Sequence, residues 1–319
     1  MGMQSGRLRA HTDTTAAVRD AEVVIIIVPA LLTPERNADL SNLEAASRVV
    51  AMGLQPDTLV CYETTVPLGA CRHELIPLLE EGGLKAGRDF SVCFSPERVK
   101  SLKVFEALSR TPKVVGGLDV HSAKRGSAFY RHYLKTEILN VGTLESAEMV
   151  KLAGMLYRDL NIALANEIAA LCEKQGLDAY DIIAAANTDG ETYLLQPGIG
   201  VGGHCTPVYP YFLITPAETK GEPLDFFKCG RQINEKQPAR NIRRLGAALG
   251  SLHGRRIHIL GLAFRPGVKE HAYSTAFALR DELARQGAII TLEDPLYSDE
   301  GVGNGYHPAT RADAHCGKR

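Results

Sequence analysis

A run of β-branched residues near the start of the chain constrains the fold most. Within the segment Ala21–Pro29, residues 23–28 are all valine or isoleucine and a proline ends the run, a pattern typical of a strand in a parallel sheet. A second such run lies at 58–64, with a helical pattern near 43–52 between the two runs, and shorter candidate strands lie at 90–94 and 113–115. Strands and helices that alternate at this spacing predict an α/β fold with a parallel sheet.

A long helical pattern follows this first region. It extends from Leu144 to Lys174, with Thr143 as the expected N-cap and Gly176 as the expected stop. A helix of this length measures about 45 Å, more than one small domain needs, so we expect it to bridge domains or to form a dimer interface. Its predicted apolar stripe consists of Met149, Leu152, Leu156, Leu160, Ala163 and Leu164.

The last third of the chain predicts a second α/β unit. A helix is expected at 225–249, followed by a strand at 256–260, a helix at 275–286 and a strand at 288–292, whereas the tail from residue 299 is expected to be unstructured. The predicted domains are 1–142, a Rossmann-like domain; 143–250, a helical dimerisation region with a cysteine loop; and 251–319, a partial α/β domain.

Composition excludes several function classes. The formal net charge is -1 without a large basic block, so we expect no nucleic-acid partner. The 7 cysteines are scattered and form no C-x-x-C pair, so we predict no metal site and a reducing, cytoplasmic environment. The longest apolar run, Val23–Leu32, is too short to cross a bilayer, and no signal peptide is recognised.

One literal G-x-G-x-x-G occurs at Gly198–Gly203. A dinucleotide-binding turn needs a strand before these glycines and a helix after them. Here Pro197 precedes the motif and His204-Cys205 follows, so we reject the cofactor interpretation. A glycine loop beside a thiol can instead hold a nucleophile close to a ligand. The alternative is a tight structural turn with a buried cysteine.

The segment Pro197–Pro207 (PGIGVGGHCTP) resembles the catalytic-cysteine motif of the UDP-glucose/UDP-N-acetylmannosamine (nucleotide-sugar) 6-dehydrogenase family. The histidine before Cys205, and the sequence PYFL after it, resemble the residues at these positions in the branch of the family that oxidises UDP-N-acetylhexosamines. Further matches occur in order along nearly the whole chain. They are SGRLRA at 5–10, ETTVP at 63–67, SPERV at 95–99, TPKVVGG at 111–117, AEMVKL at 147–152, NIALANE at 161–167 and GLAFRP at 261–266.

The resemblance implies an oxidation of the sugar C6 alcohol to a carboxylate, by two hydride transfers to NAD. By the same resemblance, Cys205 captures the aldehyde as a thiohemiacetal and then carries a thioester that water hydrolyses. Lys151 matches the family's catalytic lysine, which stabilises an oxyanion, and Glu97 matches the glutamate that assists hydrolysis. From the residues alone, Lys151 could equally be a solvated helix residue and Glu97 a loop cap.

The resemblance also assigns binding residues and partners. Pro29 and Thr65 match positions on the cofactor side. The residues matching the substrate side are Arg98, Gly198, Gly202, Phe264 and Arg265. The implied partners are a UDP-sugar and a second copy of the chain in a homodimer, without a membrane.

Several positions depart from the family pattern. Met155 stands where the family has an asparagine that donates to the oxyanion, Tyr209 where it has an aspartate, and Ala272 where it has an arginine. In the family, a first strand, a G-x-G-x-x-G and an acidic residue ending the next strand precede the segment that matches residues 5–10, and this sequence starts at that segment, as a fragment or as a truncated relative. We therefore expect weak NAD binding and an exposed sheet edge.

Three functions remain open at this point. They are the dehydrogenase itself, a catalytically silent nucleotide-sugar-binding relative, and a thiol enzyme without redox chemistry. Retention of Lys151 predicts that Cys205 is the first of the cysteines to be alkylated, ahead of Cys316.

Overall fold

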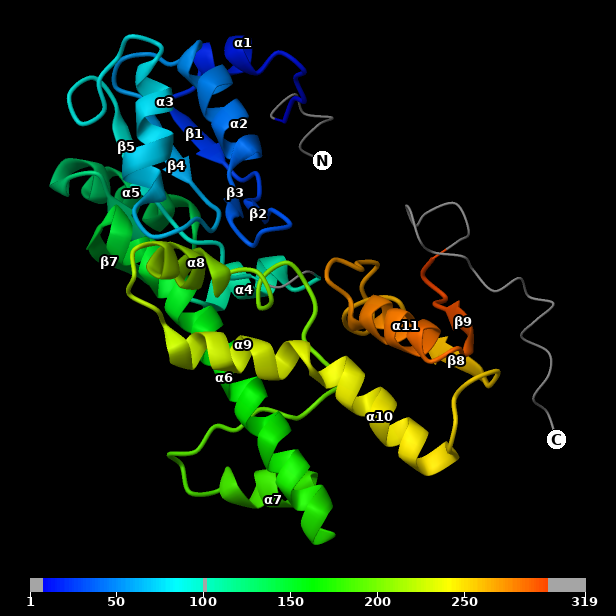
Figure 1. The fold of residues 1–319 in the computed structure, drawn as a ribbon. Coiled ribbons are helices and arrows are strands. Elements are labelled where there is room, and N and C mark those ends of the chain that lie inside the picture. Colours follow the sequence, from blue (N-terminus) through cyan, green and yellow to red (C-terminus); the bar gives the residue numbers. More distant parts are fainter. Residues whose placement is uncertain (1–7, 100–101, 298–319) are drawn as a thin grey trace. The chain divides into compact units, whose positions relative to one another are not determined.

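The structure is a computed structural model of the chain that describes residues 8–99 and 102–297. Contacts divide the chain into two compact units. The first contains residues 1–154 and 211–220, and the second contains residues 155–210 and 221–319. Each unit has its own β-sheet (Figure 1). The predicted tail from residue 299 and the reactivity comparison at Cys316 lie outside the described residues.

The first unit contains a five-stranded sheet with the strand order β1-β4-β5-β6-β7. The α/β fold with a parallel sheet is confirmed: β1–β4, β4–β5 and β6–β7 are parallel, and β5–β6 is an antiparallel pair. β6 reverses because the chain leaving β5 returns into the sheet from the same end. The strands are β1 (Val23–Ile26), β4 (Leu59–Tyr62), β5 (Ser91–Phe94), β6 (Lys113–Gly117) and β7 (Ile138–Thr143).

The central strands are buried on both faces, as the continuous apolar runs predicted. Every residue of β4 and β5 is buried. β1 is different: among the described strands of this sheet it pairs with β4 alone, and Ile25 is 41% exposed. Among the described strands, β1 is therefore an edge of this sheet.

Helices cover both faces of the sheet. On one face, the Tyr62 hydroxyl lies 2.6 Å from Ser47 of α2, and α2 and α3 lie in front of the strands in Figure 1. The neighbouring Cys61 faces the other way, since side chains alternate along a strand, and clusters with Tyr130 of α5. The helices of this unit are α1 (Thr14–Arg19), α2 (Ser41–Ala51), a π-helical turn (Cys71–Leu75) continued by α3 (Ile76–Glu80), α4 (Val104–Arg110), α5 (Val120–Tyr133) and α8 (Tyr211–Thr219). A hairpin of β2 (Leu31–Leu32) and β3 (Ala38–Asp39) follows β1.

The long predicted helix is confirmed as α6 (Leu144–Gln175). The Thr143 hydroxyl accepts from the Ser146 N–H at 3.1 Å, as an N-cap does. At the other end Gly176 has φ +69°, the left-handed conformation that ends helices. Within the predicted stripe, Leu152, Leu156 and Ala163 are buried, whereas Met149 and Leu164 are exposed.

The second unit contains most of α6 and a smaller parallel sheet. The predicted helix at 225–249 is two helices, because Pro238 cannot continue the preceding hydrogen-bond pattern and instead starts a new helix. The β8–β9 pair packs with α10 and α11 around Ile242, Leu252 and Leu283. The elements are α7 (Ala179–Ala186), α9 (Asp225–Glu235), α10 (Gln237–Leu249), β8 (Arg256–Leu260), α11 (Thr275–Arg285) and β9 (Ile289–Glu293).

Candidate functional site

Three of the predicted site residues follow the carboxyl ends of neighbouring parallel strands. Pro29 comes after β1, Thr65 after β4 and Glu97 after β5. Because parallel strands all end at the same edge of a sheet, these positions lie along that edge. In open α/β sheets this is the edge at which ligands bind.

A buried lysine joins this edge from α6. The Lys151 side chain is only 7% exposed, and its Nζ donates to the Glu97 carbonyl at 2.5 Å. Nζ also lies 3.7 Å from Glu97 Oε2, and the Glu97 carboxylate accepts from the Val99 N–H. The interpretation of Lys151 as a solvated helix residue is therefore wrong. A buried ammonium needs such partners because desolvation of a charge is costly.

The loop that carries Thr65 is fixed on both sides. The Thr64 hydroxyl donates to the Val28 carbonyl at 3.0 Å and so connects the loops that follow β4 and β1. Thr65 is buried, at 3% exposure, whereas Pro29 is exposed.

Two glutamates in the first turns of α6 hold the same loop, and sequence reasoning assigned neither of them a role. Glu148 is 1% exposed and accepts from the Gly69 N–H at 2.6 Å and the Cys71 N–H at 3.0 Å. Burial raises the pKa of Glu148 to about 7, against the opposing effect of these two hydrogen bonds. Glu145 pairs with Arg72 at 2.5 Å. The helix that carries Lys151 is thereby attached to the segment after Thr65.

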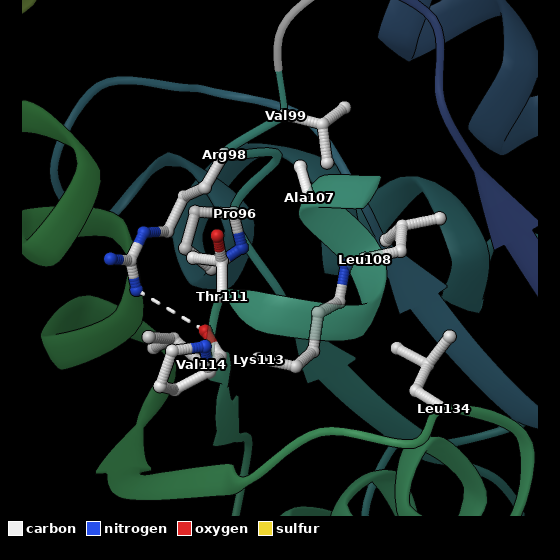
Figure 2. A pocket seen from close by; sticks show the side chains of 10 residues that line it. Pro96, Arg98, Val99, Ala107, Leu108, Thr111, Lys113, Val114 and Leu134 are labelled. Atoms are coloured by element: carbon white, nitrogen blue, oxygen red, sulfur yellow. Dashed lines mark hydrogen bonds between the residues drawn. The ribbon is translucent and has the colours of Figure 1, made fainter. Parts of the chain in front are cut away.

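Arg98 lies beside a small cavity of about 20 Å³, shown in Figure 2. Its guanidinium points to the Pro112 carbonyl, with Nη1 donating at 3.4 Å. Lys113, which also lines the cavity, forms an ion pair with Glu63. A cavity of this volume holds about one water molecule and cannot hold a sugar.

The glycine loop in the second unit is irregular and packs against Phe264. A Cβ on Gly202 would lie 2.8 Å from Phe264 Cβ, and a Cβ on Gly203 would lie 2.8 Å from the Phe264 ring. Gly203 also has φ +93°. These glycines therefore permit close packing of the loop, and the absence of a flanking strand and helix agrees with the rejection of a dinucleotide turn. Arg265 lies near the same ring, with its guanidinium carbon 5.8 Å from the ring centroid.

Two asparagines of α6 accept hydrogen bonds from the backbone at the start of this loop. Asn166 Oδ1 accepts from the Gly198 N–H at 2.9 Å, and Asn161 Oδ1 accepts from the Leu195 N–H at 2.8 Å. Both asparagines belong to the NIALANE motif. The segment that leads into the glycine loop and the first glycine of the loop are thus hydrogen-bonded to α6.

Cys205 follows this loop and is half-buried. Its carbonyl accepts from the Tyr209 N–H at 2.9 Å, which closes a turn. The next residue is held by a buried cation: Arg231 Nη1 donates to the Thr206 carbonyl at 3.3 Å. The turn of the structural-turn alternative is therefore present, but its cysteine is half-buried and not buried.

The cation belongs to a buried polar network that sequence reasoning missed. Arg231 and Asp159 are each 2% exposed and pair at 2.7 Å. Asn234 donates to Asp159 Oδ1 at 2.8 Å and accepts from Asn166 at 3.2 Å. The network joins α6, α9 and the cysteine loop. The residues that it joins on α6 and α9 lie about 70 positions apart in the chain, so no local sequence pattern predicts their contact.

Comparisons with known proteins assign the chain to a family. The sequence pattern of the UDP-glucose/GDP-mannose dehydrogenase family matches in two parts, its NAD binding domain at residues 1–134 and its central domain at residues 145–236. A UDP-N-acetyl-D-mannosamine dehydrogenase from Pyrococcus horikoshii is 35% identical over 295 residues, which cover 91% of this chain and 69% of that protein. This chain belongs to the UDP-glucose/GDP-mannose dehydrogenase family.

Solved structures agree with this assignment. The structure of a UDP-D-ManNAc dehydrogenase from Pyrococcus horikoshii has a TM-score of 0.85 at 34% identity, with 92% of this chain and 70% of that chain covered. A UDP-glucose dehydrogenase from Pyrobaculum islandicum has a TM-score of 0.84 at 28% identity, with 92% and 68% covered. The predicted family and its Rossmann-like α/β fold are confirmed.

Three positions of this family member carry residues that differ from the expected ones. Met155 is 8% exposed on α6, and its thioether offers no hydrogen to an oxyanion. Tyr209 is also 8% exposed. Ala272 contributes only its backbone, whose carbonyl accepts from the Gly203 N–H at 2.8 Å.

Two further searches concern metals and membranes. The described parts of the chain contain no group of three or more histidine, cysteine, aspartate or glutamate side chains suited to a metal ion. Within the same residues, none of the helices is both long and apolar enough to span a membrane.

Proposed function

We propose that this chain oxidises the C6 alcohol of a UDP-N-acetylhexosamine, of the UDP-N-acetylmannosamine or UDP-N-acetylglucosamine type, to the uronic acid with NAD. The observation that carries the proposal is the contact of Lys151 with Glu97 at the carboxyl edge of the sheet. Relatives with the printed name UDP-N-acetyl-D-mannosamine dehydrogenase, at 30–35% identity, and the His204-Cys205 sequence support the N-acetylhexosamine branch.

In this proposal the three catalytic residues have different tasks. Cys205 is the nucleophile that bonds to C6 of the intermediate aldehyde and later carries the acyl group. Lys151 is a buried cation that stabilises negative charge developing on the C6 oxygen. Glu97, whose backbone and carboxylate both face that ammonium, orients Lys151 and assists the water of hydrolysis.

In this proposal the carboxyl edge of the first sheet is the cofactor side of the site. Pro29 is exposed after β1, and the Thr64 hydroxyl connects the loop carrying Thr65 to the neighbouring Val28 carbonyl. NAD, when bound, accepts the hydride that leaves C6. Thr65 and Pro29 would contact it, while the first unit orients it through the strand ends.

For the sugar nucleotide we propose contacts from Arg98, Gly198, Gly202, Phe264 and Arg265. The packing of the glycines against Phe264 supports a role for this part of the loop in shaping the substrate site. The functional division that we propose is 1–142 for the cofactor, 143–250 for catalysis and dimerisation, and 251–319 for the nucleotide.

A second candidate is a catalytically silent relative that binds a nucleotide sugar. The buried Met155 favours it, because loss of one oxyanion donor typically lowers a rate by roughly 100- to 1000-fold. The buried tyrosine at position 209 favours it as well, since a neutral phenol does not act as a carboxylate base near pH 7.

We also propose a homodimer formed through α6. Tyr157, Leu164 and Leu171 are 57%, 50% and 62% exposed and recur every seven residues, so they share one face of the helix. An exposed apolar stripe of this kind is typical of a helix that packs against a second copy. In light scattering we expect a dimer that Leu164→Glu converts to a monomer, while Met52→Glu, at an exposed site on the first unit, does not. A monomeric wild type would contradict this.

NADH absorbance tests the main proposal. The protein is mixed with NAD and, in parallel, UDP-N-acetylmannosamine, UDP-N-acetylglucosamine and UDP-glucose. We expect two NADH per oxidised sugar, none with Cys205→Ser, and a rate lowered roughly 100-fold or more by Lys151→Ala. The matched control is Lys124→Ala, an exposed lysine of α5, which should not change the rate. Binding of a UDP-sugar without NADH from any of the three would favour the silent relative.

A further inference from the structure

A histidine and a carboxylate form a pair beside the proposed nucleophile. His204, the residue before Cys205, places its Nε2 against Glu270 Oε1. The His204 side chain is 50% exposed and that of Glu270 is 27% exposed, so water reaches both. His204 immediately precedes Cys205 in the chain, so their Cα atoms are about 3.8 Å apart.

Backbone hydrogen bonds hold the two segments together independently of this pair. The Gly203 N–H donates to the Ala272 carbonyl at 2.8 Å, and the Glu270 carbonyl accepts from the Phe264 N–H at 3.0 Å. The glycine loop also packs on Phe264. A contact of this kind between partly exposed side chains adds only about 0–1 kcal/mol of stability to an arrangement that is already fixed. A purely structural role therefore explains little of why a histidine and a carboxylate meet here.

The geometry points to a catalytic role: we infer that His204, oriented by Glu270, accepts the proton of the water that hydrolyses the acyl–Cys205 thioester. An imidazole whose one nitrogen contacts a carboxylate keeps its other nitrogen, here Nδ1, for proton transfer. The inference deepens the proposed function and rests on it for the origin of the thioester. It also supplies the proton acceptor that Tyr209 does not provide.

The step balances as follows. The water oxygen bonds to the thioester carbonyl carbon while one water proton moves to Nδ1 of His204. The C–S bond then breaks, Cys205 leaves as the thiolate, and the product is a carboxylic acid that releases its proton to solvent. The imidazolium returns its proton to solvent, and no oxidant or reductant is needed in this half of the reaction.

Hydrolysis can be measured without NAD or a UDP-sugar. p-Nitrophenyl acetate acetylates an accessible thiol and releases nitrophenolate, and the lifetime of acetyl–Cys205 is then followed by mass spectrometry. We expect His204→Asn and Glu270→Gln each to lengthen this lifetime by roughly 10- to 100-fold. The matched control is His271→Asn, a histidine of the same loop whose Nδ1 faces the Tyr297 hydroxyl at 3.3 Å, and its lifetime should equal that of the wild type.

Each outcome decides between the alternatives. Wild-type deacetylation rates in both His204→Asn and Glu270→Gln overturn the inference, as does a Cys205 that the reagent leaves unmodified while other cysteines react. If His204→Asn lengthens the lifetime but also changes the melting temperature, the lifetime in His204→Gln decides, because glutamine keeps the size of the side chain but not the base. A longer lifetime in His204→Gln at the wild-type melting temperature upholds the inference, and a wild-type lifetime overturns it. A His204-dependent lifetime without any NADH formation would uphold this inference while the oxidation proposal fails.

Discussion

The buried pair of Asp159 and Arg231 permits a quantitative prediction. Both side chains are 2% exposed and meet at 2.7 Å. Replacement of Arg231 with methionine keeps much of the packing volume but leaves the carboxylate without its cation. Removing one partner of a buried ion pair typically costs about 3–5 kcal/mol. With a melting temperature that changes by about 2–4 °C per kcal/mol in domains of comparable size, we expect a decrease of roughly 6–20 °C.

The pH dependence of this loss has a definite sign. Burial already raises the pKa of Asp159, and the Arg231 charge opposes that rise. In Arg231→Met the charge that lowered this pKa is absent, so the folded-state pKa of Asp159 rises further. A raised carboxyl pKa stabilises the folded state below the unfolded pKa and loses that contribution as pH rises through the folded value. The loss of unfolding free energy in Arg231→Met, relative to the wild type, should therefore be smallest near pH 4 and grow toward neutral pH.

Thermal and urea unfolding followed by circular dichroism measure both effects. The matched control is Arg244→Met, because Arg244 pairs with Glu173 at 2.5 Å but is 55% exposed, and exposed pairs contribute about 0–1 kcal/mol. The double variant Asp159→Leu/Arg231→Met should recover part of the loss, since no buried charge remains. An Arg231→Met protein as stable as the control, or a double variant no better than the single, would refute the reasoning.

Three further predictions concern other parts of the chain. Glu148→Gln should be less stable than the wild type at pH 5, and this difference in unfolding free energy should shrink by roughly 2–3 kcal/mol at pH 8. The reason is that a carboxyl with a pKa raised to about 7 stabilises the folded wild type only at the lower pH, where it is protonated. Equal differences at the two pH values in urea unfolding would contradict this. Gly203→Ala, with φ +93° and a contact at 2.8 Å, should destabilise by about 1–3 kcal/mol, while Gly198→Ala, whose nearest contact is at 4.0 Å, should not. Iodoacetamide should label Cys205 before the exposed Cys229 in a short time course followed by mass spectrometry, and the reverse order would count against an activated thiol.

Local signals explain what the sequence could predict of the fold. The two ends of α6 were predictable because Thr143 and Gly176 act on their own neighbours. The buried strands β4 and β5 were predictable from continuous apolar runs. β7 was not, because its half-exposed residues around Gly142 carry neither an apolar run nor a clear alternation.

The candidate site was less accessible to sequence reasoning. The resemblance supplied Glu97 and Lys151, whereas their contact spans 54 positions of the chain and has no local signature. The same holds for Glu148, which binds backbone N–H groups 77 and 79 positions away. Such partners are chosen by the tertiary fold, so a pattern along the chain does not reveal them.

The three buried charged residues on α6 also limit how this helix can evolve. Glu148, Lys151 and Asp159 each meet a different partner segment at short range. A slip of the helix by one turn, about 5.4 Å, would unpair all three at once. Glu148 binds backbone N–H groups, so no single partner side chain can compensate for its loss, whereas Asp159 pairs with the Arg231 side chain. We expect co-variation of position 159 with position 231, while the exposed face of the same helix drifts freely wherever it does not meet a partner.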